Sequence, residues 1–517
     1  MEGTRKSLLK GIIGWVTNRP ERTDGGNTYW IYGLPGIGKT SLAHSICANL
    51  DDQEQLAGAF FCRTDNSELS KPRNILPTLI HKLARIFPPF RCVVAERLRK
   101  DPILTTELME TLLLDSLCKL PRLPKRTLVF VIDALDECDN AQDYPDILKA
   151  LTSATAHAPW LKIIITSRPK RNIQYCFDAL NPSTHCRYDL TADNETTSDL
   201  RIFAKDRLNR VAFKWCLQTP WPEQALFDSM ISQAEGLFIF IETIALALEQ
   251  CDDPNELFKA TLRDSAGTGL TSLYRLYSSI LKARIMHHNA EFRRVIGVLL
   301  ITAPNRPLCE DTIAELVGVR PGLAKMWVAS LRPMLYQDED AGGGIRVRHL
   351  TVSDFFLSDD NKGDFRVNLR DVNLQLGITC LKKMVEQLRF NICKLEDSRL
   401  ANDDVKDLPS RIKENISDAL QYSSLYWSNH LCFTPDIGYR AWESLWEFFS
   451  GLHPLFWIEV LSIMGMLRIG VRSLQKVIST LVKVSTSLSS WPSKVVLTCC
   501  RMQIYPSWKK FRMSVVS

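Results

Sequence analysis

The stretch GLPGIGKT, residues 33–40, combines residue types and a spacing that suit phosphate binding. Gly36 and Gly38 let the backbone curl, so that successive N–H groups can point at phosphate oxygens. Lys39 offers a mobile cation, and the Thr40 hydroxyl can coordinate Mg²⁺. The pattern G-x-x-x-x-G-K-[ST] therefore predicts a loop that binds a nucleotide. We expect its contacts to come from Gly33, Pro35, Gly36, Gly38, Lys39, Thr40 and Ser41.

A carboxylate that could hold Mg²⁺ follows the apolar run RTLVFVID, which ends at Asp133. We expect this run to be a strand beside the one that leads into the glycine-rich loop. The Asp133 side chain would then emerge at the carboxyl edge of the sheet, where such sheets bind ligands. Thr40 and Asp133 are thus the predicted metal ligands. The alternative is an aspartate that only caps a following helix.

The residues after Asp133 carry the candidate hydrolytic groups. In continuously working ATPases a glutamate directly follows the magnesium aspartate and polarises the attacking water. Here Ala134 takes that position, and acids return only at Asp136 and Glu137. We expect Asp136 to orient the water and Glu137 to support it. Such an arrangement favours slow turnover, which suits a switch better than a motor.

The elements that must position these residues alternate between strands and helices over residues 27–190. Short apolar strands are predicted at residues 28–33, 57–63, 126–133, 161–167 and 184–190, with a helix at 40–50 after the glycine-rich loop. Two of them have nearly continuous β-branched or apolar cores, which is typical of central parallel strands. The order predicts a doubly wound α/β domain with a parallel sheet. An amphipathic helix with Leu8, Leu9, Ile12, Ile13 and Val16 on one side precedes it.

The strand signal fades after residue 190. Residues 226–250 have helical spacing, and residues 291–357 predict short helices, a glycine turn at 342–344 and a strand IRVRHLTV, together a winged-helix-like unit. Helical periodicity dominates residues 370–480. There Trp442, Leu445, Trp446 and Phe449 predict one buried stripe. Residues 454–471 are interrupted by Glu459 and Arg468, so we expect a buried helix and no membrane span.

Composition places the chain among cytoplasmic globular proteins. It has 517 residues, 45% hydrophobic and 24% charged, and its fifteen cysteines lack the CxxC spacing of zinc sites. The formal charge of +6 comes from the end of the chain, because nine Lys or Arg and no acid follow Glu459. The remainder, residues 1–459, carries about −3, which gives no support to nucleic-acid binding.

Several of these segments resemble the NACHT family of signal-transduction NTPases within the STAND class. Residues 133–137, Asp-Ala-Leu-Asp-Glu, match its pattern of a small residue after the magnesium aspartate and acids further on. FFCRTD and ILPTLIHKLA resemble fungal members, especially the nephrocystin-like N-terminal NTPase group. AEGLFIF resembles the family's helical-domain motif, RHLTVSDFF its winged-helix motif, and LRFNICKLEDS a C-terminal helical region of mushroom-type members.

The resemblance implies an NLR-like switch that binds ATP or GTP with Mg²⁺ and holds ADP at rest. It implies that Arg168 senses the terminal phosphate and that His349 lies near the β-phosphate. A histidine on a β-ribbon with only local partners is the alternative for His349. The triphosphate form would self-associate, in fungal non-self recognition or programmed cell death. The triggering ligand and the effector and sensor partners do not follow from the sequence.

The predicted domains follow from these segments. They are an N-terminal helix and linker at 1–26, a NACHT P-loop NTPase domain at 27–190, a helical domain at 191–285, a winged-helix-like domain at 286–362, a helical domain at 363–485 and a basic tail at 486–517. The tail is either a product of a truncated or mis-spliced gene model or a short basic extension, with a membrane-surface segment as a third possibility.

Two other functions are compatible with the same motifs. The chain could be a non-hydrolytic scaffold that binds nucleotide structurally and acts through its C-terminal helices. It could also be a DNA-associated regulator that uses the winged helix. The segment 291–357 lacks a concentrated basic recognition helix, although Arg346 and Arg348 flank the expected strand.

Overall fold

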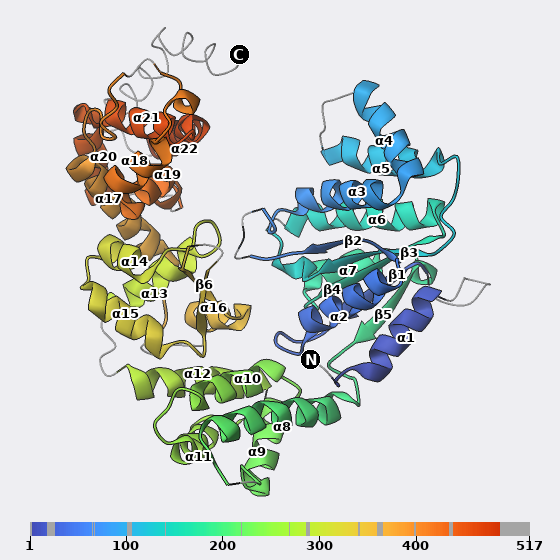
Figure 1. Cartoon of the computed structure of the whole chain (residues 1–517). Helices are drawn as coiled ribbons and strands as arrows, with labels where there is room; N and C mark the ends of the chain where they lie inside the picture. The colour runs from blue at the N-terminus through green and yellow to red at the C-terminus, as the bar shows by residue number, and fades with distance from the viewer. Residues whose placement is uncertain are drawn as a thin grey trace. The chain divides into compact units, whose positions relative to one another are not determined.

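The structure is a computed structural model, and it divides the chain into two compact units. Its described residues are 3–17, 26–64, 66, 68–100, 106–139, 141–218, 220–267, 269–285, 290–339, 342–358, 365–397, 400–433 and 438–485. The first unit contains Met1–Arg284, Leu331–Met334 and Val347–Phe355, and the second contains Ile285–Ser330, Leu335–Arg346 and Phe356–Ser517. This division crosses the segment predicted as a winged-helix domain, because parts of that segment group with the NTPase region. Figure 1 labels the elements of both units.

The first unit contains a five-stranded sheet in the order β2-β3-β4-β1-β5, and every pair of neighbours is parallel. The strands are β1 Thr28–Tyr32, β2 Leu56–Phe61, β3 Leu128–Asp133, β4 Leu161–Ser167 and β5 His185–Asp189. The predicted parallel α/β sheet and its five strands are confirmed. One expectation is wrong: β3 does not pair with β1, because β4 pairs with both and lies between them.

The two inner strands β3 and β4 are buried along their whole length, as their continuous apolar runs predict. Helices cover both faces of the sheet, and each face has its own apolar core (Figure 1). One face packs α1 Lys6–Thr17 and α2 Lys39–Asp52. The other packs α3 Ile75–Ile86, α4 Pro88–Lys100, α5 Thr106–Cys118, α6 Tyr144–His157 and α7 Arg171–Asp178.

Helix α1 confirms the predicted amphipathic stripe. Leu8, Ile12 and Val16 are buried, and Leu9 and Ile13 pack against the same core at the edge of the stripe. The spacing of three and four residues puts all five on one side of the helix. This stripe joins the segment before the sheet to the face that carries α2.

The rest of the first unit is helical after β5. Its helices are α8 Thr196–Lys214, α9 Gln224–Ala234, α10 Phe238–Leu248, α11 Pro254–Asp264 and α12 Gly269–Arg284. The periodic stretch 226–250 contains two helices, since Glu235 and Gly236 have φ values of 42° and 81°. Both values lie in the left-handed region, which ends α9 and lets α10 start in a new direction.

The second unit begins with α13 Ala290–Thr302, α14 Glu310–Val317 and α15 Pro321–Ser330, followed by a two-stranded sheet of β6 Leu335–Asp338 and β7 Gly344–Val347. The predicted strand IRVRHLTV is therefore too long. Only its first residues are extended, and α16 Leu350–Leu357 begins three residues after β7 ends. The residues Val347–Phe355 at this junction belong to the first unit.

The C-terminal part contains α17 Leu369–Gln387, α18 Leu408–Asn415, α19 Asp418–Leu431, α20 Gly438–Ser450, α21 His453–Ile463 and α22 Leu467–Ser485. The stripe predicted on α20 is wrong in part. Trp446 is 47% exposed, whereas Ala441, Leu445, Phe448 and Phe449 are buried. The buried face of α20 thus includes Phe448 and Phe449 and leaves out Trp446.

The apolar run 454–471 forms parts of two helices, because the chain turns at Gly465 with φ 69° between α21 and α22. Within the described residues, no helix combines the length and apolar character that crossing a bilayer requires. The predicted basic tail at 486–517 lies outside the described residues.

Candidate nucleotide-binding site

The phosphate loop, residues 33–40, connects the end of β1 to the first turn of α2. Gly36 and Gly38 have φ values of 82° and 95°, in the region that only glycine enters without strain. A Cβ atom on Gly36 would lie 2.3 Å from Cγ2 of Ile239. The loop therefore needs glycine at both positions to curl around the N-terminus of α2, which is the geometry of an anion site.

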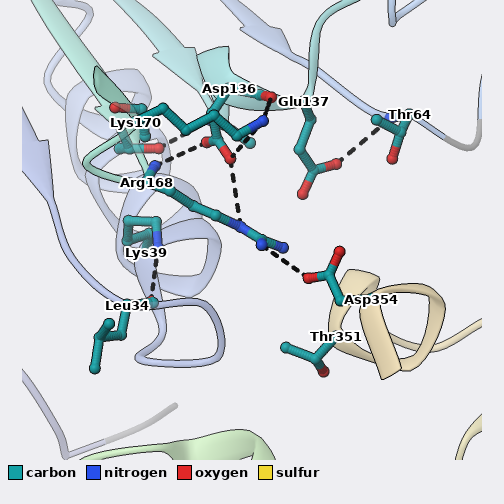
Figure 2. Close-up of polar contacts among 12 residues, drawn as sticks. Leu34, Lys39, Thr64, Asp136, Glu137, Arg168, Lys170, Thr351 and Asp354 are labelled. Atoms are coloured by element: carbon teal, nitrogen blue, oxygen red, sulfur yellow. Dashed lines mark hydrogen bonds and ion pairs between the residues drawn. The ribbon is translucent and has the colours of Figure 1, made fainter. Parts of the chain in front are cut away.

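Lys39 lies inside this curl and is only 9% exposed. Its Nζ donates hydrogen bonds to the carbonyl oxygens of Gly33 and Leu34, both at 2.8 Å (Figure 2). Burial lowers the pKa of Lys39 to about 8, and the nearby Asp136 carboxylate partly opposes that shift. The ammonium group is thus held within the loop.

The predicted metal ligands Thr40 and Asp133 lie together, although Thr40 is in the first turn of α2 and Asp133 ends β3, which does not pair with β1. The Asp133 carboxyl is hydrogen-bonded by the hydroxyls of Thr40 and Thr166, and Thr166 Oγ1 donates to Asp133 Oδ1 at 2.5 Å. Burial raises the pKa of Asp133, while these hydrogen bonds and the charge of Lys39 oppose the rise. Two hard oxygen donors therefore meet beside the loop.

A cavity of about 350 Å³ opens over the loop. This volume is within the range of about 300–1,000 Å³ that small-molecule sites occupy. Its wall is built from the loop, the turn after β3, the end of β4, helices α8 and α10, and the start of α16. The lining residues are Pro35, Gly36, Gly38, Lys39, Thr40, Ser41, Ala134, Asp136, Glu137, Arg168, Phe203, Phe238, Ile239, Glu242 and His349. Gly33 and Asp133 lie behind this wall.

The turn after β3 gives a structural reason for the gap between Asp133 and the next two acids. Ala134 has φ 54°, a left-handed conformation, and its N–H donates to Thr166 Oγ1 at 2.9 Å. The turn leads into a short 3₁₀ helix, η2 Leu135–Glu137. This reversal turns Asp136 and Glu137 back toward the cavity.

Asp136 is 3% exposed and is held by basic groups. Its Oδ1 accepts the backbone N–H of Arg168 at 2.8 Å, and its own carbonyl accepts Lys170 Nζ at 2.7 Å. Oδ2 lies 3.4 Å from Arg168 Nε. The carboxylate thus fixes the position of the chain after β4 (Figure 2).

Glu137 has weaker partners and a different protonation behaviour. Among the described residues, its Oε2 accepts a long hydrogen bond of 3.5 Å from the Thr64 N–H (Figure 2). Burial, followed by the charge of Asp136, raises the pKa of Glu137 to about 7. A carboxylate with this pKa is suited to general-base chemistry near neutral pH.

Arg168 lies between two carboxylates that come from distant parts of the chain. Besides its contact with Asp136, its Nη1 forms an ion pair of 2.8 Å with Oδ2 of Asp354 in α16 (Figure 2). The Arg168 side chain is 19% exposed, and the cavity lies beside it. The arginine assigned to phosphate sensing is therefore next to the loop and already paired.

His349 lies just before α16 and lines the same cavity. Its Nδ1 is 2.8 Å from Thr351 Oγ1 and accepts the Thr351 N–H at 3.2 Å. Burial, with the charges of Arg168 and Lys39, lowers the pKa of His349 to about 3. Since β7 ends at Val347, His349 is not on a β-ribbon, but it does have the expected local partner in Thr351.

Residues that the motifs did not single out complete the site. Thr166 bonds both Asp133 and the turn at Ala134, and Lys170 holds the carbonyl of Asp136. In α10 the N–H of Ile239 donates to the Gly36 carbonyl at 3.3 Å. The sequence did contain a signal for this contact. The stretch AEGLFIF includes Glu235 and Gly236, whose left-handed turn directs the start of α10 toward the loop.

Arg5 connects the N-terminal segment to the same corner and is 6% exposed. Its Nη1 pairs with Asp193 at 2.6 Å, and its Nη2 donates to the Ile37 carbonyl at 3.4 Å. The guanidinium also lies 5.7 Å from the ring centroid of Phe238. One arginine thus ties together the segment before α1, the phosphate loop and the start of α10.

Comparisons with known proteins match part of the first unit. Residues 5–168 match the family model described as "Nephrocystin 3, N-terminal". No curated protein matches the chain.

Solved structures similar to this chain include Cdc6p from Pyrobaculum aerophilum, with 12% identity over 74% of this chain and 95% of that one, at a TM-score of 0.31. Orc1 from Aeropyrum pernix, solved in complex with DNA, has 12% identity over 69% and 93%, at a TM-score of 0.30. A RuvB variant from Thermotoga maritima has 14% identity over 66% and 90%, at a TM-score of 0.27. Residues 5–168, which include Lys39, Asp133 and Arg168, are thus similar to the nephrocystin 3 N-terminal family.

Proposed function

We propose that this chain is a nucleotide-dependent molecular switch that binds ATP or GTP with Mg²⁺ and hydrolyses it slowly. The observation that carries the proposal is a loop that glycine alone can form, with Lys39 and Thr40 lining one cavity and the buried Asp133 carboxyl hydrogen-bonded to Thr40 behind it. Backbone N–H groups and the N-terminus of α2 would bind the phosphates. Lys39 would leave the carbonyls of its loop and bind the terminal phosphates.

The donor set fits Mg²⁺. This ion prefers oxygen ligands and is usually held by one or two carboxylates together with substrate phosphates and water. Thr40 and Asp133 supply one hydroxyl and one carboxylate, and the described residues contain no group of three His, Cys, Asp or Glu that would favour another metal. When bound there, Mg²⁺ would neutralise phosphate charge.

The roles that we propose for the two later acids reverse those expected from the sequence. Asp136 holds the backbone of Arg168 and the side chain of Lys170, so we assign it to positioning. Glu137 faces the cavity with a pKa of about 7, so we assign it as the base that accepts a proton from the attacking water. Neither group sits directly after Asp133, which fits slow turnover.

The switch would belong with fungal NACHT proteins of the STAND class. ADP would hold the resting state with His349 near its β-phosphate, and exchange for the triphosphate would allow self-association. A nucleotide can shift such an equilibrium only through different affinities for the two states. Non-self recognition or programmed cell death is the process that this resemblance favours.

The test begins with the full chain as purified. We expect a bound nucleoside diphosphate to be released on denaturation, and its base decides between ATP and GTP. We expect turnover on the order of 10⁻³ s⁻¹, as in switch GTPases, rather than the 1–100 s⁻¹ of kinases. Light scattering should report larger assemblies with a non-hydrolysable triphosphate than with the diphosphate.

Lys39→Ala is the decisive variant, with Lys205→Ala as its control, because Lys205 is exposed on α8 and forms no ion pair in the described residues. We expect Lys39→Ala to abolish nucleotide retention and assembly. If Lys39→Ala still assembles while retaining no nucleotide, the scaffold function replaces the switch. Rapid turnover by a constant monomer would contradict both.

A further inference from the structure

The structure assigns Asp354 as the residue that sets the preference of the site for a nucleoside diphosphate over a triphosphate, by competing with the terminal phosphate for Arg168. This inference rests on the proposed function, because it concerns the same cavity. It adds a specificity-determining residue that touches the site only through the arginine. Arg168, Asp136 and Asp354 all belong to the first unit.

The Arg168 guanidinium contacts two carboxylates. Arg168 Nη1 is 2.8 Å from Asp354 Oδ2, and Arg168 Nε is 3.4 Å from Asp136 Oδ2. Figure 2 shows the arginine side chain extending from Asp136 toward Asp354, above the loop that carries Lys39. The guanidinium is therefore shared between two carboxylates at the wall of the cavity.

Helix α16 is anchored by buried contacts on both sides of Asp354. Thr351 Oγ1 lies 2.9 Å from the hydroxyl of Tyr277 in α12, and both residues are fully buried. Phe355 packs edge-on against Tyr277, with ring centroids 5.5 Å apart. Thr351 and Phe355 flank Asp354 on the same short helix, so the backbone that carries Asp354 is anchored beside Arg168, while its side chain is 34% exposed.

A diphosphate and a triphosphate would affect the Arg168–Asp354 ion pair differently. A triphosphate adds a dianionic group that needs a cation at the end of the cavity, and Arg168 is the arginine that lines it. To bind that group, Arg168 must give up Asp354, and the freed carboxylate would repel the phosphate. A diphosphate ends one phosphate earlier and leaves the pair intact. Asp354 thus penalises the triphosphate selectively.

The segment that carries Asp354 lies, in the sequence, between two parts of the second unit. Val347–Phe355 groups with the first unit, while Leu335–Arg346 before it and Phe356–Ser517 after it belong to the second. The segment that carries Asp354 is therefore covalently joined at both ends to the other unit. Occupancy by a triphosphate would favour release of this segment, which is a differential interaction of the kind that a switch requires.

The experiment measures equilibrium binding of fluorescent methylanthraniloyl diphosphates and non-hydrolysable triphosphates, in adenine and guanine forms, to the full chain. We expect Asp354→Asn to raise triphosphate affinity relative to diphosphate affinity on the order of tenfold, within the usual range of coupling between sites. Arg168→Gln should lower triphosphate affinity. In the double variant, Asp354→Asn should add nothing to Arg168→Gln, because it acts through the arginine.

The matched control is Asp228→Asn, which breaks an ion pair of 2.6 Å with Arg201 on the helical surface of the same unit and should leave the ratio unchanged. Unchanged diphosphate affinity in Asp354→Asn shows that the variant is folded. A ratio equal to that of the wild type, or an effect that persists in the Arg168→Gln background, overturns the inference alone. Wild-type protein that binds neither ligand overturns the proposed function itself.

Discussion

The phosphate-loop corner of the first unit contains a half-buried histidine and the α17–α19 core of the second contains a buried one, and the neighbours of the two histidines differ. In the first, Lys39 and Arg168 accompany His349 at the wall of a cavity. In the second, the ring of His430 lies between two neutral groups, 2.8 Å from the Tyr422 hydroxyl and 2.9 Å from Asn373 Oδ1. Burial lowers the pKa of both histidines to about 3.

Buried polar groups serve different purposes in the phosphate-loop corner and in the helical core. Around the phosphate loop, charged groups are held in contacts that a phosphate could replace, such as the bonds of Lys39 to its own loop. In the helical core, the Tyr422 hydroxyl, the His430 ring and the Asn373 amide oxygen are hydrogen-bonded in series between α17 and α19, next to packed aromatic rings. The first region is built for exchange of partners and the second for stability.

The largest effect should come from the helical core. Trp427 is fully buried, and its ring centroid lies 5.8 Å from that of Trp457 and 6.0 Å from that of Phe448. Trp427→Ala should cost about 3–5 kcal/mol in the free energy of unfolding, because it removes a large side chain and leaves a cavity. Denaturant titration measures this loss. Diphosphate affinity should not change, and a parallel loss of affinity in folded protein would show that the two regions are not separate.

A smaller effect is expected at Glu137. Glu137→Gln should lower nucleotide turnover about a hundredfold, which corresponds to about 2.7 kcal/mol, with little change in affinity. Because the pKa of Glu137 is about 7 and the base must be ionised, wild-type turnover should rise with pH through 7. Single-turnover assays at several pH values test both points. If Glu137→Gln keeps full turnover and Asp136→Asn does not, the assignment of these acids is reversed.

The contributions of His430 and Glu137 to stability should depend on pH with opposite signs. The pKa of His430 is lowered from 6.5 to about 3 by folding, so the unfolded state binds more protons below pH 6.5. Its contribution to the free energy of unfolding should fall by about 1.4 kcal/mol for each pH unit below that value. Glu137 has the opposite sign, since its pKa rises from 4.5 to about 7 and its contribution falls as pH increases across that range.

Denaturation of wild type and His430→Gln between pH 7 and pH 5 isolates the histidine, because His349 contributes equally to both proteins. The variant should lose a part of the acid sensitivity. His157→Gln, at an exposed position on α6, is the control and should keep all of it. A variant with the wild-type slope would show that His430 is not buried in its neutral form.

The smallest effect is expected at Trp446, which the sequence placed in the core and the structure leaves 47% exposed. Trp446→Ala should change the free energy of unfolding by no more than about 0.5 kcal/mol, as surface substitutions generally do. Compared with Trp427→Ala in the same denaturation assay, this change tests the face of α20. A cost near that of Trp427→Ala would restore the predicted stripe.

Much of the first unit could be predicted because its signals are local. The glycine spacing of residues 33–40 requires a curled loop, and the apolar runs ending at Asp133 and Ser167 predict buried parallel strands. The spacing in α1 identified the side that packs. In each case the residues that decide the conformation lie within a few positions of one another.

The errors concern neighbours that are distant in sequence. The order of strands placed β4 between β1 and β3, and packing against other helices selected Phe448 rather than Trp446 on α20. The roles that we propose for Asp136 and Glu137 rest on Arg168 and Lys170, more than thirty residues away, which contact Asp136.

The sequence alone determined that a phosphate loop precedes a helix and that a buried strand delivers Asp133, since backbone conformation follows from local residue types and their period. Tertiary structure alone decided which carboxylates contact Arg168, including Asp354 from a distant segment, and that His349 precedes a helix. The physical reason is that charge pairing and burial depend on distances in space, which the chain fixes only when separate elements pack together.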